Sequence, residues 1–273
     1  MSSTRVRWRS DAPRAIAVAQ TCPVPGDVAA NLEEHLRLAG AAAAEGAGVV
    51  VFPELSLTGY ELDLAEGLAF SEDDPRLAPL LEAAARHSMT LIAGAPVRLG
   101  PRLHIGALVL APTGTTELYT KRHLGVFSAG ASRDGTVPPA EATVFAPGDR
   151  DPLLPVGGGL AAVAVCADTG QAAHAQRAAD RGAGTYLASM FVVPSDIERE
   201  TETLRGYAAR HSMAVAMANF GGPSGGLASG GRSLIWSETG ELVVELLAAG
   251  AGVAVATESA QGWRAARVLL DGL

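Results

Sequence analysis

The chain has few cysteines, no long apolar run and no cluster of basic residues. Cys22 and Cys166 are its only cysteines, so no disulfide framework is expected and a reducing, cytoplasmic location is favoured. No apolar stretch approaches the length that spans a membrane, and residues 1–13 are polar and Arg-rich, unlike a signal peptide. A net charge of −8 without a basic cluster argues against nucleic acid and membranes as partners.

The rest of the sequence is a long series of alternating strand and helix patterns. Its 273 residues, 48% of them apolar, suffice for one large α/β domain. We expect a disordered tail over residues 1–13 and a single domain over residues 14–273. Residues 122–150 are rich in Gly, Pro and Ser without any period, which predicts a long functional or disordered loop.

Each half of the chain predicts strand, helix, strand, helix and then further strands. Two such halves indicate an α/β fold in which two mixed sheets pack face to face with helices outside, a four-layer αββα sandwich. The predicted strands are 15–20, 49–52, 91–95, 105–110, one ending at Thr120, 160–165, 185–189, 214–219, 232–237 and 241–247, and the predicted helices are 27–45 (with Asp27 as N-cap), 76–87, 171–182, 196–212 and 260–270.

Cys166 stands where a predicted strand passes into a predicted helix. The free N–H groups and the positive end of a helix favour a thiolate, so Cys166 is a candidate nucleophile with a partly ionised thiol. The alternative is that it is a small buried hydrophobic residue, as many free cysteines are.

Two charged residues also follow predicted strands. Glu54 comes directly after an apolar strand and a proline, in FPELSLTGY, and Lys121 ends a short strand in LYTKRHL. Taken alone, Glu54 fits a surface turn and Lys121 fits a solvated basic patch.

Together, the FPE motif, the LYTKRHL segment and the strand-to-helix cysteine resemble the carbon–nitrogen hydrolase (nitrilase) superfamily, which carries Glu, Lys and Cys in this order. The likeness extends from about Ile16 to the turn at Gly240. It implies an αββα sandwich, a Glu-Lys-Cys triad, no metal or organic cofactor, and a homodimer or larger homo-oligomer. Glu141, shortly before FAPG, matches a second active-site carboxylate of that family.

The resemblance also implies a role for each residue. Cys166 attacks an amide carbonyl and forms a thioester, while Glu54 transfers the protons. Lys121 and the backbone N–H of Ala167 stabilise the oxyanion. Glu141 orients Lys121 and the substrate amine.

The segment after the cysteine departs from the family. Many members have an aromatic residue and then an Arg segment here, whereas residues 166–171 read CADTGQ. Because a buried carboxylate needs a cationic partner, a neutral acyl group is expected to fit better beside Ala167, Met190 and Phe191. The candidates elsewhere for binding a substrate carboxylate are Arg133, Arg210 and Arg232.

These patterns predict a thiol-dependent amidase that acts on a small linear amide. A nitrile hydrolase, an N-acyltransferase and a non-catalytic binding relative remain alternatives, because they share the scaffold. Residues 222–226 (GPSGG) match the serine elbow G-x-S-x-G but lack the strand and helix that the motif needs. His174 is predicted to be exposed on a helix, and no histidines have metal-ligand spacing.

Overall fold

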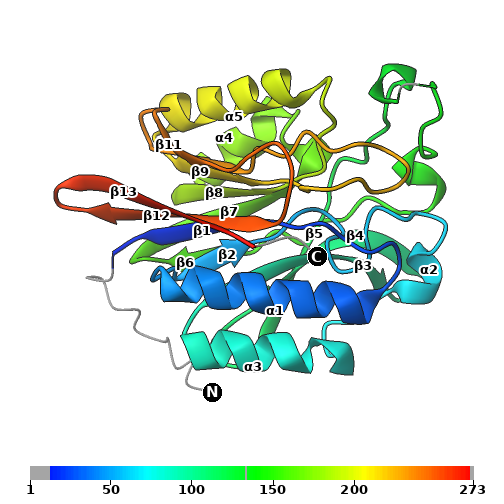
Figure 1. Cartoon of the computed structure of the whole chain (residues 1–273), viewed down its shortest axis with the longest axis horizontal. Coiled ribbons are helices and arrows are strands. Elements are labelled where there is room, and N and C mark those ends of the chain that lie inside the picture. The colour runs from blue at the N-terminus through cyan, green and yellow to red at the C-terminus, as the bar shows by residue number, and fades with distance from the viewer. Residues whose placement is uncertain (1–12, 133, 271–273) are drawn as a thin grey trace.

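The computed structural model describes residues 13–132 and 134–270, so the predicted tail, except Pro13, lies outside the described residues. Figure 1 shows its strands stacked between two pairs of helices. The strands are β1 (Ala15–Gln20), β2 (Val49–Val51), β3 (Thr90–Leu99), β4 (Arg102–Leu110), β5 (Thr116–Thr120), β6 (Leu153–Val156), β7 (Gly159–Val165), β8 (Ala183–Ser189), β9 (Ala214–Ala218), β10 (Leu234–Trp236), β11 (Leu242–Glu245), β12 (Gly252–Ser259) and β13 (Gly262–Leu269). The α-helices are α1 (Val28–Ala44), α2 (Ala65–Leu68), α3 (Ala78–His87), α4 (Ala172–Asp180) and α5 (Ile197–His211).

Within the described residues, the strands form two mixed sheets. A seven-stranded sheet has the order β13-β12-β1-β2-β3-β4-β5, and a six-stranded sheet has the order β11-β10-β9-β8-β7-β6. Helices α1 and α3 cover the outer face of the first sheet, and α4 and α5 cover that of the second (Figure 1). The predicted four-layer αββα sandwich is therefore confirmed. No helix in the described part of the chain is long and apolar enough to cross a membrane.

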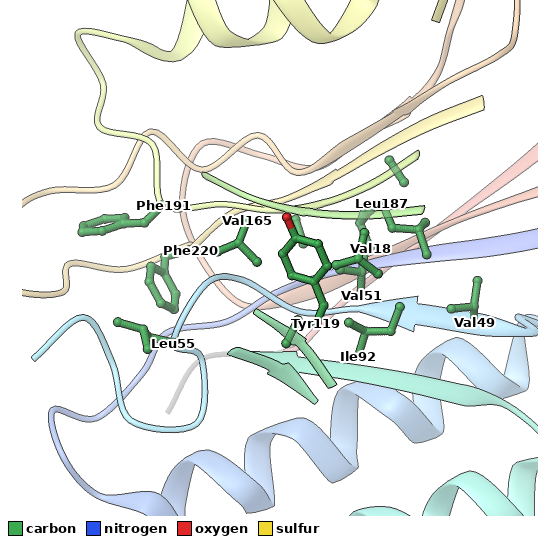
Figure 2. Close-up of a cluster of buried hydrophobic side chains, with 14 of the residues drawn as sticks. Val18, Val49, Val51, Leu55, Ile92, Tyr119, Val165, Leu187, Phe191 and Phe220 are labelled. Carbon is green, nitrogen blue, oxygen red and sulfur yellow. The ribbon is translucent and has the colours of Figure 1, made fainter. Parts of the chain in front are cut away.

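The inner faces of the two sheets share one apolar core. Val51 and Ile92 of the first sheet face Val165 and Leu187 of the second, and Tyr119 lies between the sheets with its hydroxyl directed at the second (Figure 2). Because helices cover the outer faces as well, the central strands are apolar on both sides, which explains their continuous apolar sequence. Each fully buried side chain of this size contributes about 1.5–3 kcal/mol.

The start of α1 confirms one local prediction. The Asp27 side chain accepts a hydrogen bond from the backbone N–H of Ala30 at 3.0 Å. This cap satisfies one of the N–H groups that the first turn of a helix leaves unpaired.

The C-terminal segment is a β-hairpin, so the predicted helix over 260–270 is wrong. β12 pairs antiparallel with β1 from Gly252 to Thr257, and β13 pairs antiparallel with β12. Trp263 and Ala266 have helical spacing, but β12, which is itself paired with β1, offers main-chain partners to this segment. Gly262 closes the hairpin with a φ of +103°, which glycine adopts without strain. In the six-stranded sheet, the unpredicted edge strand β6 pairs with β7.

Candidate active site

The three predicted catalytic residues follow strands that end on the same side of the sandwich. β2 and β5 run in the same direction in the first sheet, and β7 and β8 are parallel in the second. Glu54 follows β2, Lys121 follows β5 and Cys166 follows β7. Ligand sites in α/β sheets commonly form at the carboxyl ends of strands, and here two sheets contribute to one site.

Hydrogen bonds join the two sheets at this point. The Glu54 N–H donates to the Met190 carbonyl at 3.3 Å, and the Ser189 hydroxyl donates to the Phe52 carbonyl at 2.8 Å. A Cβ on Gly94 of β3 would lie 2.4 Å from backbone atoms of the turn that carries Glu54. Only glycine therefore lets β3 pass this close to the turn that carries Glu54.

Lys121 is buried between two carboxylates. Its Nζ donates to Glu54 Oε1 at 2.6 Å and to Glu141 Oε1 at 2.7 Å, and all three side chains are almost fully buried. Glu141 is held in turn by the Tyr60 hydroxyl and the Gly125 N–H, each at 2.7 Å. Lys121, the only lysine in the sequence, is thus neither exposed nor part of a basic patch.

The protonation of this cluster follows from its burial. Desolvation raises the pKa of Glu54 to about 7, with Lys121 lowering it and Glu141 raising it. Burial alone lowers the pKa of Lys121, but Glu54, Cys166 and Glu141 outweigh it and hold that pKa above its usual value. Glu54 Oε2 accepts no hydrogen bond from the described residues. A carboxyl that titrates near neutrality beside a permanent ammonium can both take and give a proton.

Cys166 opens a 3₁₀ turn, Cys166–Asp168, with a φ of +43° that non-glycine residues rarely adopt. Its thiol is half-buried and donates weakly to the Phe191 carbonyl at 3.6 Å. Such strain commonly marks a side chain that is held in a fixed orientation for function.

The predicted thiolate at a helix N-terminus is wrong. Burial raises the pKa of the Cys166 thiol well above its usual value, and Glu54 and Glu141 raise it further against the opposing effect of Lys121. The helix α4 begins only at Ala172, so its N–H groups do not follow the thiol directly. A nucleophilic role for this thiol would therefore require a base.

A buried carboxylate ties the nucleophile turn to the segment after Lys121. Asp168 accepts hydrogen bonds from the Tyr119 hydroxyl at 2.7 Å and from the backbone N–H groups of Arg122 and His123 at 3.1 and 2.9 Å. Since Tyr119 and Lys121 lie on one short segment, Asp168 couples the positions of Cys166 and Lys121.

His174 extends this network and is buried, contrary to the exposed position predicted for it. Its Nε2 contacts the Tyr119 hydroxyl at 2.9 Å and its Nδ1 contacts the Tyr186 hydroxyl at 2.8 Å. Because Tyr119 donates its proton to Asp168, its oxygen accepts from His174 Nε2–H, and His174 Nδ1 accepts from Tyr186. Burial lowers the pKa of His174, which fits this neutral tautomer.

A cavity of about 150 Å³, partly open to solvent, is lined by the cysteine. The rings of Tyr60, Phe127 and Phe191 contact one another there, with centroids 5.2–5.5 Å apart. A wider surface hollow of about 820 Å³ holds none of the catalytic candidates, so the smaller cavity is the candidate site. The predicted pocket residues Ala167, Met190 and Phe191 all line this smaller cavity. The lining residues that the sequence analysis did not identify are Tyr60, Gly125, Val126, Phe127, Gly170, Val192, Asp196, Arg199 and Glu200.

The GPSGG segment supports this cavity from outside. Ser224 is buried and accepts a hydrogen bond from the Tyr60 N–H at 2.7 Å, and the Gly225 N–H donates to Glu61. Ser224 therefore anchors the loop that carries Tyr60 and is not presented as a nucleophile. The described residues hold no group of three or more His, Cys, Asp or Glu side chains arranged to bind a metal.

Comparisons with known proteins agree with this geometry. The carbon-nitrogen hydrolase family matches residues 15–268. A variant of the amidase from Nesterenkonia sp. AN1, with the acetamide moiety of fluoroacetamide bound covalently at its active-site cysteine, superposes with a TM-score of 0.78. The two are 25% identical, and the alignment covers 90% of each chain.

Two relatives found by sequence are longer proteins. An arylacetonitrilase from Aspergillus niger is 32% identical over 133 residues, 44% of this chain and 37% of the relative. A glutamine-dependent NAD(+) synthetase from Mycobacterium bovis is 30% identical over 246 residues, 81% of this chain and 35% of the relative. The aligned region thus spans little more than a third of either relative.

The fold, together with the family match over residues 15–268, defines an α/β enzyme of the nitrilase type. The chain belongs to the carbon-nitrogen hydrolase family, and the predicted enzyme class, a hydrolase of carbon–nitrogen bonds other than peptide bonds, is confirmed.

Proposed function

We propose that the protein hydrolyses small linear amides through a thioester on Cys166. One observation carries the proposal: Glu54, with a pKa of about 7, and the Lys121 ammonium are buried together beside a thiol that lines a small cavity. The similarity to an amidase that carries a covalent acetamide moiety at its active-site cysteine supports it.

In the acylation step, Glu54 takes the thiol proton on its unpaired oxygen while Sγ attacks the amide carbon. Lys121 uses two of its three N–H donors on Glu54 and Glu141, which leaves the third for the oxyanion. The N–H of Ala167, near the start of a 3₁₀ turn, supplies a second donor. The C–N bond then breaks, and the amine leaves with the proton from Glu54.

In the deacylation step, water enters where the amine left. Glu54 takes a proton from the water as its oxygen attacks the thioester carbonyl, and Lys121 again stabilises the oxyanion. The C–S bond breaks, Glu54 returns the proton to the sulfur of Cys166, and a carboxylic acid departs. Glu141 acts through Lys121, whose Nζ it holds at 2.7 Å, and is assigned here as a positioning residue.

A nitrile hydrolase is the second candidate, because an arylacetonitrilase matches part of the chain. That match covers 44% of the chain, whereas the amidase superposition covers 90%, which favours the amide. An N-acyltransferase would use the same thioester with an amine in place of water. The cytoplasmic location and the homodimer stay predictions.

The proposal is tested by incubating the protein with acetamide, butyramide and butyronitrile, then measuring released ammonia and the mass of the intact protein. We expect ammonia from the amides and a transient acyl mass on the peptide that contains Cys166. Intact amide bound without ammonia release would instead indicate a binding protein, and faster release from the nitrile would indicate a nitrilase.

The pH dependence of kcat/KM should report the raised pKa of Glu54. Because Glu54 must be ionised to accept the thiol proton, kcat/KM is expected to rise about tenfold per pH unit up to an apparent pKa near 7 and then to level off. Profiles of kcat/KM between pH 5 and 9 measure this dependence. Glu54→Gln should lose most of the activity, and the activity that remains should no longer fall on the acid side of pH 7. An acid limb near pH 4.5, the usual value for a glutamate, would contradict the assignment.

A further inference from the structure

We propose that the mouth of the cavity selects substrates by charge and prefers short amides whose acyl chain ends in a positively charged amine. This inference rests on the proposed amidase function and names the substrate class of that site. It is carried by the charged residues where the cavity meets solvent, which catalysis does not use.

The mouth is formed by the start of α5. Asp196, Arg199 and Glu200 all line the cavity, and their side chains are 29%, 66% and 20% exposed. Arg199 is held by both acids: its guanidinium lies 3.2 Å from Asp196 Oδ1 and 3.1 Å from Glu200 Oε1. A substrate carboxylate would have to displace one of these partners to pair with Arg199.

The two carboxylates keep unused acceptor capacity. Neither Asp196 Oδ2 nor Glu200 Oε2 accepts a hydrogen bond from the described part of the chain. A substrate ammonium has three donors and no acceptor, so it can bond these oxygens without breaking the contacts to Arg199. The mouth can therefore bind a cation at these two carboxylate oxygens.

Elsewhere the cavity lining adds one further carboxylate, Glu141. This carboxylate bonds the Lys121 ammonium, whereas Lys121 and Glu54 themselves do not line the cavity. The charged side chains that line the cavity are thus three carboxylates, Glu141, Asp196 and Glu200, and one cation, Arg199. A low-dielectric cleft strengthens the field of such an excess. This excess of negative charge in the lining disfavours an anionic substrate relative to a cationic one.

The start of α5 does not reverse this balance. A helix N-terminus is partly positive and by itself attracts anions. Here Asp196 at the N-cap and Glu198 and Glu200 in the first turn already offset that end. The arginines considered from the sequence provide no partner for a substrate carboxylate here. Neither Arg210 nor Arg232 lines the cavity, and Arg232 is bound to Glu245 and Glu198. Arg133 lies outside the described residues.

The size and the walls of the cavity limit the acyl chain. A volume of about 150 Å³ is equivalent to roughly five water molecules at liquid density. Phe127, Phe191 and Val192 make its middle apolar, which suits a few methylene groups. The geometry therefore fits a short ω-amino amide, with the amide at Cys166 and the ammonium near Asp196 and Glu200.

Three substrates of matched length test the charge preference: 5-aminopentanamide, pentanamide and 4-carbamoylbutanoate. At pH 8 and low salt, kcat/KM is expected to be about fivefold higher for the amine than for the neutral amide, and at least about tenfold lower for the carboxylate. Because exposed charges are screened by salt, 0.5 M NaCl should compress these ratios.

Substitutions at the mouth should change the ratio of kcat/KM for 5-aminopentanamide to kcat/KM for pentanamide, and the acidic and basic residues should change it in opposite directions. Asp196→Asn and Glu200→Gln are expected to lower it about threefold each, whereas Arg199→Gln should raise it. Glu202→Gln is the matched control, because Glu202 lies on the same helix, pairs with exposed Arg205 and does not line the cavity. The ratio should not change in this control.

A preference for the carboxylate, or shifts at Asp196, Arg199 and Glu200 no larger than that of Glu202→Gln, would overturn the inference. Its failure is separable from that of the proposed function. If pentanamide is hydrolysed but the charge order is reversed, only the inference fails. If no amide is hydrolysed, the amidase proposal fails, and calorimetric binding of the charged amides to Cys166→Ala still tests the order.

Discussion

Replacing Cys166 with alanine is expected to abolish amide hydrolysis while leaving the fold intact. Without the sulfur no thioester can form, and loss of a catalytic nucleophile costs roughly 10⁵–10⁶-fold in turnover. The backbone at this position has a φ of +43° with cysteine already, so alanine adds no new strain. Ammonia release gives the activity, and thermal unfolding checks that Tm stays within a few degrees.

Cys22→Ala is the matched control for this substitution. Cys22 is also a half-buried thiol, but it lies beside Glu34 and does not line the cavity. Burial and Glu34 raise the pKa of Cys22 to about 11. Its removal should leave kcat/KM within about twofold. Activity retained in Cys166→Ala, or lost in Cys22→Ala, would rule out the assigned nucleophile.

Lys121→Ala is expected to remove both activity and stability. Loss of an oxyanion donor costs about 10²–10³-fold in kcat. The substitution also leaves Glu54 and Glu141 buried without their cation, and breaking a buried pair in this way costs about 3–5 kcal/mol. Chemical denaturation at pH 8 measures the loss. A solvated basic patch, the alternative from the sequence, would lose almost no stability.

The stability loss should depend on pH. Desolvation already raises the pKa of Glu54 to about 7, and without Lys121 the main opposing effect is gone, so the folded-state pKa rises further. A carboxyl whose pKa is higher in the folded state destabilises the protein as pH rises through that pKa. Below about pH 7, Glu54 binds its proton in both the folded parent and the folded variant, so the part of the deficit that Glu54 causes should appear as pH rises above about 7 and be larger at pH 8 than at pH 5. The double variant Lys121→Ala/Glu141→Gln removes one of the two unpaired carboxylates, so it should recover stability at pH 8 while staying inactive. A Tm of Lys121→Ala equal to that of the parent protein would contradict the buried cluster.

The sequence was most informative where local pattern and chemistry coincide. Glu54, Lys121 and Cys166 each follow an apolar strand, and strand ends can be recognised from a few neighbouring residues. The sandwich itself could be predicted from the repeated order of strands and helices, because fully covered sheets require continuous apolar strands.

The errors arose where the outcome depends on distant neighbours. The segment 260–270 has spacing compatible with a helix, and it became β13 because β12, held on β1, offered it backbone partners. His174 sits on a helix face that the sequence reads as polar, yet Tyr119 and Tyr186 enclose it. No local pattern reveals either partner.

The sequence by itself determined the layered fold, the family and the identity of the three candidate catalytic side chains. Only the tertiary structure decided their protonation and surroundings: a neutral thiol at Cys166, a carboxyl at Glu54 that titrates near neutrality, and a mouth lined by Asp196 and Glu200. The physical reason is that desolvation and Coulomb interactions depend on distances between groups far apart in the chain, which the packing of two sheets sets.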